Sequence, residues 1–143
     1  MGTLIISASA FAAPGPLVVD GHTGLALSGF DPVAYFTEHK PKLGRAGLEL
    51  RQNGAVWRFC NEGNRAAFAE HPDIYGPRFG GYDPVAIARG ASVAGHPLIW
   101  AMVGARLYLF YNAAARAVFL SDPGRIIMAA ERKWPTVAAG IPR

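Results

Sequence analysis

The chain has 143 residues, which is the length of one domain, and 51% of them are hydrophobic while 17% are charged. This balance excludes a disordered acidic or low-complexity protein. Fourteen Lys and Arg against ten Asp and Glu give a net charge of +4. Because the basic residues form no run longer than Arg132-Lys133, we expect no nucleic-acid partner. The single cysteine, Cys60, excludes an intrachain disulfide.

The first thirteen residues, MGTLIISASAFAA, carry no charged side chain and end in small residues. Ala10-Phe11-Ala12 matches the small-x-small pattern of a signal-peptide cleavage site, although positive residues before the apolar stretch are missing. The stretch is too short to span a bilayer. We therefore expect residues 1–13 to be a signal-peptide remnant, and the mature chain to be periplasmic or secreted with no membrane span. A buried N-terminal strand is the alternative. If residues 1–13 are a signal-peptide remnant, residues 14–24 form an N-terminal tether.

An internal repeat organises the rest of the chain. GFDPVA at residues 29–34 recurs as GYDPVA at 81–86, and WRFCN at 57–61 matches YLFYN at 108–112. So many ordered matches indicate two copies of one unit of roughly fifty residues, packed together because neither could bury enough surface alone.

A β-hairpin is predicted in the middle of each copy. In the first copy the turn is Asn53-Gly54, the strongest short hairpin signal, since both residues accept a positive φ. A two-residue loop there gives four cross-strand pairs: Gln52–Ala55, Leu50–Trp57, Leu48–Phe59 and Glu49–Arg58. In the second copy Gly104-Ala105 serves as the turn, and the expected pairs are Ile99–Phe110 and Ala101–Tyr108.

Short helices are predicted on either side of each hairpin. Asn61 and Asn112 stand at N-cap positions after the hairpins. These helices end at His71-Pro72 and Asp122-Pro123, because proline disfavours a helical residue before it.

The hairpins are also preceded by helix signals. Asp31 and Asp83 each precede a proline, which is the pattern of a cap followed by the first helical residue. A last helix is predicted from Arg125 to Lys133, ending at Trp134-Pro135.

The predicted fold class is therefore α+β. Residues 25–135 form a single domain of two tandem helix–β-hairpin–helix units, at about 25–80 and 81–135, related by a pseudo-twofold repeat. Residues 136–143 are left as a C-terminal tail.

Three blocks of sequence carry a resemblance to a known family. They are GFDPVAYFTEHKP from residue 29, the block from NGAVWRFCN to GGYDPVA, and the terminal LYLFYN with RKWP. In order and spacing they resemble the YHS-domain family, in particular its small exported bacterial members, from about Leu25 to Trp134. The resemblance implies a compact domain related to treble-clef-like metal-binding units. For the stand-alone members it implies no defined biochemical activity.

The resemblance also implies ligand positions, most of which this chain has lost. Metal-binding relatives carry Cys after DPV and a Cys-x-x-Cys after the aromatic strand, where this chain has Ala34, Cys60 and Gly63. Exported relatives often carry Cys where this chain has Asp83. A closed zinc site needs four N or S ligands, so these positions cannot form one.

A rebuilt metal site from Cys60, His71 and Asp83 is the remaining metal candidate. Each residue also has a structural interpretation. Cys60 would be a small half-buried hydrophobe, His71 a helix stop like Asp122, and Asp83 a cap like Asp31.

Catalytic patterns are missing from the sequence. No base stands near Cys60, no serine lies in a nucleophile elbow, and the glycines between the two copies do not form a phosphate loop. We expect no enzyme activity.

Aromatic residues supply the candidates for binding an organic ligand. We single out Trp57, Tyr82 and Tyr35, in a pocket between the two copies. Core packing is the alternative role for all three.

The sequence therefore predicts a non-catalytic, exported YHS-type binding module for a metal ion or a small ligand. The cofactor is not identified, and a bound metal ion is an open alternative. The other function it leaves open is a protein-interaction or self-association module without a cofactor, for example a homodimer.

Overall fold

The computed structural model describes residue 2 and residues 15–142, so the predicted signal-peptide remnant lies outside the part we describe in detail. The described chain is α+β, with six helices and two small antiparallel hairpins. In chain order its elements are η1 (Leu27–Gly29), α1 (Ala34–Thr37), β1 (Arg45–Gln52), β2 (Ala55–Phe59), α2 (Glu62–Glu70), α3 (Pro72–Tyr75), η2 (Arg78–Gly81), α4 (Pro84–Ala88), β3 (His96–Val103), β4 (Arg106–Phe110), α5 (Ala113–Ser121) and α6 (Pro123–Ala139). None of these helices is long and apolar enough to cross a bilayer.

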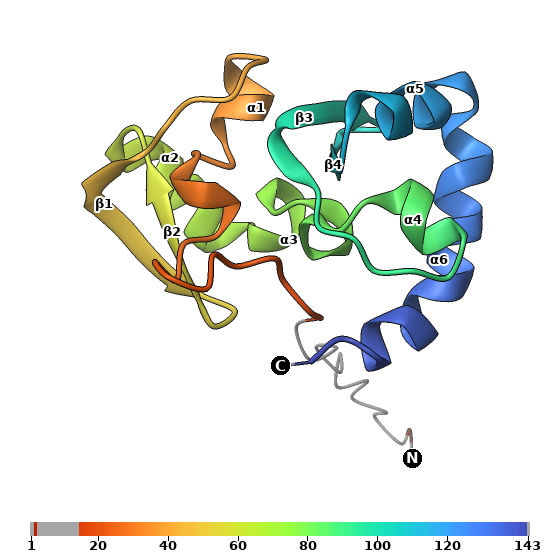
Figure 1. Cartoon of the computed structure of the whole chain (residues 1–143). Coiled ribbons are helices and arrows are strands. Elements are labelled where there is room, and N and C mark those ends of the chain that lie inside the picture. The colour runs from red at the N-terminus through yellow and green to blue at the C-terminus, as the bar shows by residue number, and fades with distance from the viewer. Residues whose placement is uncertain (1, 3–14, 143) are drawn as a thin grey trace.

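The elements gather into two lobes (Figure 1). The first lobe, residues 25–76, holds β1, β2, α1 and α2, and the second lobe, residues 78–142, holds β3, β4 and α4 to α6. α3, the last helix of the first lobe, lies on the side that faces the second lobe, and the N-terminal segment runs along the lower edge of both lobes in this view. The order of elements, from a 3-10 turn to two consecutive helices, is the same in both lobes.

The two lobes share one strand, β4. Successive side chains of a strand point to opposite faces, and here both faces are buried. Leu107 and Leu109 belong to the hydrophobic cluster of the first lobe, whereas Tyr108 and Phe110 belong to that of the second. β2 is buried on one face only. The β3–β4 hairpin therefore joins the two clusters.

Both predicted turns are confirmed, and so is most of the register near them. The observed pairs include Gln52–Ala55, Leu50–Trp57, Glu49–Arg58 and Ala101–Tyr108. Two predicted pairs, Leu48–Phe59 and Ile99–Phe110, are wrong. Phe59 pairs with Arg45 and Phe110 with His96, because each long strand contains an irregularity before its last pair. Counting outward from the turn assumes an unbroken ladder, which a bulge interrupts.

A glycine directly precedes each of these irregular strands: Gly44 before β1 and Gly95 before β3. The N–H of Gly44 donates to the Gly29 carbonyl and that of Gly95 to the Gly81 carbonyl, both at 2.8 Å. A Cβ on Gly95 would lie 2.6 Å from the Leu109 Cβ, and one on Gly44 would lie 2.5 Å from the Phe59 nitrogen. The incoming chain thus passes so close to β2 and β4 that no side chain fits.

The predicted caps and stops are confirmed for the helices after the hairpins. The side chain of Asn61 accepts from the Asn64 N–H, and that of Asn112 accepts from the Ala115 N–H, both at 2.8 Å. α2 and α5 end just before His71 and Asp122, as predicted.

The predicted end of the last helix at Trp134-Pro135 is wrong, since α6 continues to Ala139. A proline within a helix removes one hydrogen bond, but side chains on both sides of Pro135 hold the helix against the second cluster. Ile126, Ile127 and Val137 all pack there. Part of the predicted C-terminal tail is therefore helical.

The segment predicted to be a tether is packed where the structure describes it. Leu17 and Val19 contact the first cluster. The Val18 N–H donates to the Gly80 carbonyl at 2.8 Å. Residues 15–19 therefore line the junction of the lobes, because the apolar side chains of Leu17 and Val19 find a buried surface there.

The close approach at Gly95 gives a test of this fold. We expect Gly95→Ala to lower the free energy of unfolding by about 1–3 kcal/mol, because the new methyl must displace backbone or core atoms. Gly47→Ala in β1 is the control, since no heavy atom lies within 4 Å of its Cβ position. Urea denaturation measures both, and equal stabilities would contradict the described crossing.

Candidate functional site

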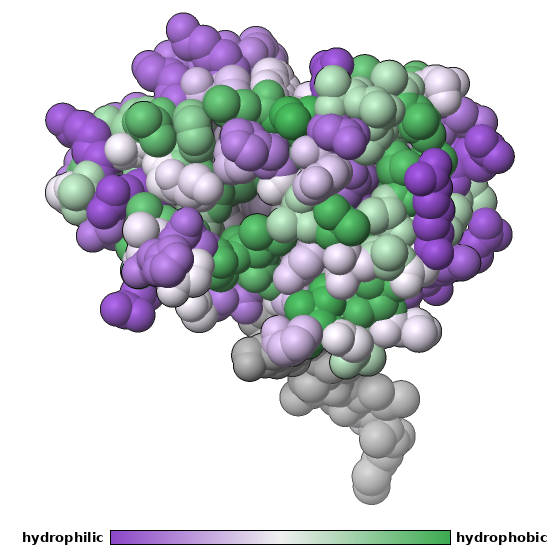
Figure 2. All heavy atoms as spheres, viewed as in Figure 1, coloured by the Kyte–Doolittle hydropathy of each residue, from purple (hydrophilic) through white to green (hydrophobic). Residues whose placement is uncertain are grey.

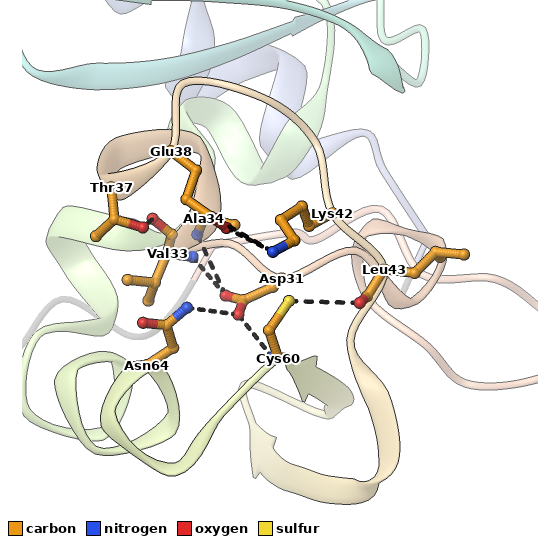
Figure 3. A network of polar contacts seen from close by, with 9 residues as sticks. All are labelled: Asp31, Val33, Ala34, Thr37, Glu38, Lys42, Leu43, Cys60 and Asn64. Atoms are coloured by element: carbon orange, nitrogen blue, oxygen red, sulfur yellow. Dashed lines mark hydrogen bonds and ion pairs between the residues drawn. The ribbon is translucent and has the colours of Figure 1, made fainter.

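A buried carboxylate, that of Asp31, lies beside Cys60. Asp31 is 0% exposed. Its Oδ1 accepts from the N–H groups of Val33 at 2.8 Å and Ala34 at 3.4 Å. Its Oδ2 accepts from the Cys60 N–H and from the Asn64 side-chain amide, both at 2.8 Å (Figure 3). The carboxylate therefore ties the start of α1 to the end of β2 and to α2.

The second lobe has a matching carboxylate. Asp83 is 2% exposed. It accepts from the Val85 N–H at 2.8 Å and from the Tyr111 N–H at 3.0 Å. Asp83 is the N-cap of α4, as predicted. Buried carboxylates are tolerated when hydrogen bonds replace their hydration, so both aspartates have a structural role.

The Cys60 thiol lies beside this network and is half-buried. Its Sγ donates to the Leu43 carbonyl at 3.4 Å (Figure 3). Burial first, and then the Asp31 carboxylate, raise the pKa of the Cys60 thiol, while Lys42 opposes the shift. Because the thiolate is the nucleophile and the metal ligand, this environment disfavours both roles.

The three predicted metal ligands do not lie together in the described part of the chain. Cys60 lies next to Asp31, whereas the carboxylate of Asp83 is bonded within the second lobe. His71 ends α2. Within the part of the chain that the structure describes, no three His, Cys, Asp or Glu side chains come together as a ligand group. The structure thus does not assemble Cys60, His71 and Asp83 into one site.

A cavity lined by aromatic side chains lies where the two lobes meet. Its volume is about 520 Å³. Four aromatic side chains line it, from β2, α2, η2 and α6: Trp57, Phe68, Phe79 and Trp134. The ring centroids of Trp57 and Phe68 are 4.6 Å apart, and those of Phe79 and Trp134 are 5.5 Å apart. Residues 15–17 of the N-terminal segment form part of the wall.

Polar groups complete this cavity. The Arg78 guanidinium forms an ion pair with Glu131 at 3.1 Å and lies 5.1 Å from the centre of the Phe79 ring. The Asn53 amide donates to the Gly15 carbonyl at 3.3 Å. Asp73 is the other ionisable residue that lines the cavity among the described residues. The cavity therefore combines flat apolar walls with a few hydrogen-bonding groups.

One of the three predicted ligand-binding aromatics lines this cavity. Trp57 does, and its indole N–H is held by the Gln52 carbonyl at 2.9 Å. Tyr82 packs against Trp134, with centroids 6.1 Å apart, but does not line the cavity. Tyr35 is fully buried.

The hydroxyl of Tyr35 donates to the Pro97 carbonyl of β3 at 2.7 Å. Its ring meets Trp100 edge-on, at a centroid distance of 5.4 Å. Burial raises the pKa of the Tyr35 hydroxyl, so it remains a donor. Tyr35 therefore fastens α1 of the first lobe to β3 of the second.

Phe68 and Phe79, which also line the cavity, were not predicted to bind a ligand. They come from α2 and η2, which α3 separates in the sequence. The available signal was the position of Phe79 in the short connection between the two repeats, where a side chain can face both.

Comparison of the chain with protein-family models, with curated proteins and with solved structures finds no match. The YHS resemblance thus rests on its sequence blocks and stays a prediction.

The hydrogen bonds of Asp31 give a stability test. We expect Asp31→Ala to lower the free energy of unfolding by about 3 kcal/mol or more, since several buried donors lose their acceptor at roughly 1–3 kcal/mol each. Asp20→Ala is the matched control. Asp20 also accepts two backbone N–H bonds, but at an exposed turn where water can replace it. Urea denaturation compares them, and similar losses would contradict a special role for Asp31.

The raised pKa of Cys60 gives a pH test. Because the folded chain favours the protonated thiol, we expect the rate of iodoacetamide alkylation to rise at a higher pH than in the same chain unfolded in urea. At pH 8 the folded chain should therefore react more slowly. Mass spectrometry follows the single adduct. A folded protein that reacts faster than the unfolded chain would indicate an activated thiol instead.

Proposed function

We propose that this chain is an exported, non-catalytic binding module of YHS type, built from two tandem units, that holds a small flat organic ligand. The aromatic cavity between the lobes is the observation that carries the proposal. Its volume of about 520 Å³ lies within the 300–1,000 Å³ typical of small-molecule sites.

Several observations support the tandem YHS-type arrangement. The order of elements is the same in both lobes. The buried aspartates, the entering glycines and the asparagine caps occur at matching positions of both lobes. The export part of the proposal rests on the apolar sequence of residues 1–13.

The chemistry of the cavity supports binding over catalysis. Aromatic walls suit a flat apolar molecule, which gains by leaving water and by stacking. Of the two ionisable groups that line the described cavity, Arg78 is in an ion pair with Glu131. The Cys60 thiol belongs to the network around Asp31 and does not line the cavity.

A neutral fluorescent probe tests this proposal. We expect N-phenyl-1-naphthylamine to bind in a 1:1 ratio with increased fluorescence. Gly15→Phe should weaken binding at least about tenfold, because Gly15 lines the cavity and its Cβ position lies 3.9 Å from the Trp134 ring. The new ring would therefore occupy the space that the probe needs.

Gly21→Phe is the matched control. Gly21 belongs to the same N-terminal segment, no heavy atom lies within 4 Å of its Cβ position, and it does not line the cavity. It should bind the probe like the unchanged chain. No saturable fluorescence, or equal binding by the two variants, would contradict the proposed site.

The alternative function, a protein-interaction or self-association module, is favoured by exposed apolar side chains. Tyr111 is 62% exposed, and Val118 and Met128 are also exposed. Figure 2 shows apolar side chains at the surface of both lobes and along the seam between them. Sedimentation of the probe-free protein separates the two functions, because a ligand-binding module stays monomeric without its ligand whereas a self-associating module does not.

A further inference from the structure

The positive charge of this protein belongs to one part of the chain. From residue 15 to residue 80, seven Lys and Arg stand against seven Asp and Glu. From residue 81 onward, seven Lys and Arg stand against three Asp and Glu. The net charge of +4 therefore comes from the part of the chain that begins at residue 81.

The three acidic side chains of this part already have hydrogen-bond or ion-pair partners. Asp83 is buried and accepts backbone N–H groups. Asp122 forms an ion pair with Arg125, and Glu131 forms one with Arg78.

Two of the basic side chains donate hydrogen bonds to backbone carbonyls. Arg106 donates to the Asp73 carbonyl at 2.7 Å and Arg116 to the Trp100 carbonyl at 2.6 Å. Three described basic residues of the second lobe remain: Arg89, Arg132 and Lys133. None of the three forms an ion pair in the described part of the chain.

Two of these three residues, Arg132 and Lys133, line one groove. It has a volume of about 640 Å³ and lies between the loop at residues 90–92 and α6. Arg132, Lys133 and Thr136 line it from α6, and Ser92 lines it from the loop. Arg89 directly precedes the loop. α4, from which the loop leads, lies beside α6 (Figure 1). No Asp or Glu is among the residues lining the groove in the described chain.

We propose that this groove binds a phosphate group, carried by a soluble molecule or by a lipid headgroup. An Arg and a Lys supply charge-assisted donors, and the hydroxyls of Ser92 and Thr136 supply neutral donors for the remaining oxygens. Arg in particular presents a fork of N–H groups that matches phosphate oxygens.

The dipole of α6 determines at which end of the groove the phosphate binds. Gly140, at the far end of the groove, follows the C-terminal end of α6, where carbonyl oxygens repel an anion. The group therefore binds at the end lined by Arg132 and Lys133. This site is separate from the aromatic cavity, and the two do not share lining residues.

Calorimetric titration with pyrophosphate and sedimentation with lipid vesicles test the inference. We expect saturable binding of pyrophosphate, or of phosphatidylglycerol vesicles but not phosphatidylcholine vesicles. The double variant Arg132→Gln/Lys133→Gln should weaken that binding at least tenfold. Both residues are exposed, so the variant should keep its fold, which its melting temperature checks.

The control is Lys40→Gln/Arg51→Gln, which removes the same charge from exposed positions of the first lobe. It should bind like the unchanged chain. Pyrophosphate binding would identify a soluble ligand, and binding of phosphatidylglycerol vesicles alone would identify a lipid headgroup. Equal loss in both double variants, or no binding of either probe, would overturn the inference.

Discussion

In each lobe a buried carboxylate holds the loops in place. One oxygen of Asp31 or Asp83 accepts from the start of a short helix, and the other accepts from the residue that follows the hairpin. Burying a charge is costly unless several donors surround it, so this arrangement specifies the path of both segments. The residue that follows, Asn61 or Asn112, is the N-cap of the helix after the hairpin.

The same interaction limits what the Asp31 carboxylate can bind beside Cys60. A carboxylate that already accepts hydrogen bonds on both oxygens has little capacity left for an ion. Its charge also opposes the thiolate form of the neighbouring cysteine.

The two lobes are joined by apolar packing and a tyrosine hydrogen bond, not by the buried carboxylates. β4 is buried on both faces, and Tyr35 reaches across to the Pro97 carbonyl. At this junction the ring of Trp57 packs against Phe68, and the ring of Phe79 packs against Trp134. A cavity remains between them, and the N-terminal segment closes one side of it.

The sequence by itself determined the local elements. The Asn53-Gly54 turn, the Asn61 and Asn112 caps and the stops at His71 and Asp122 depend on residues close in the chain, and all were predicted correctly. Tertiary structure alone decided the strand irregularities, the continuation of α6 through Pro135 and the double burial of β4. It also decided which aromatics share a cavity: Trp57 was predicted to bind a ligand, while Phe68 and Phe79 were not. These features depend on contacts between residues far apart in sequence, whose packing no local pattern encodes.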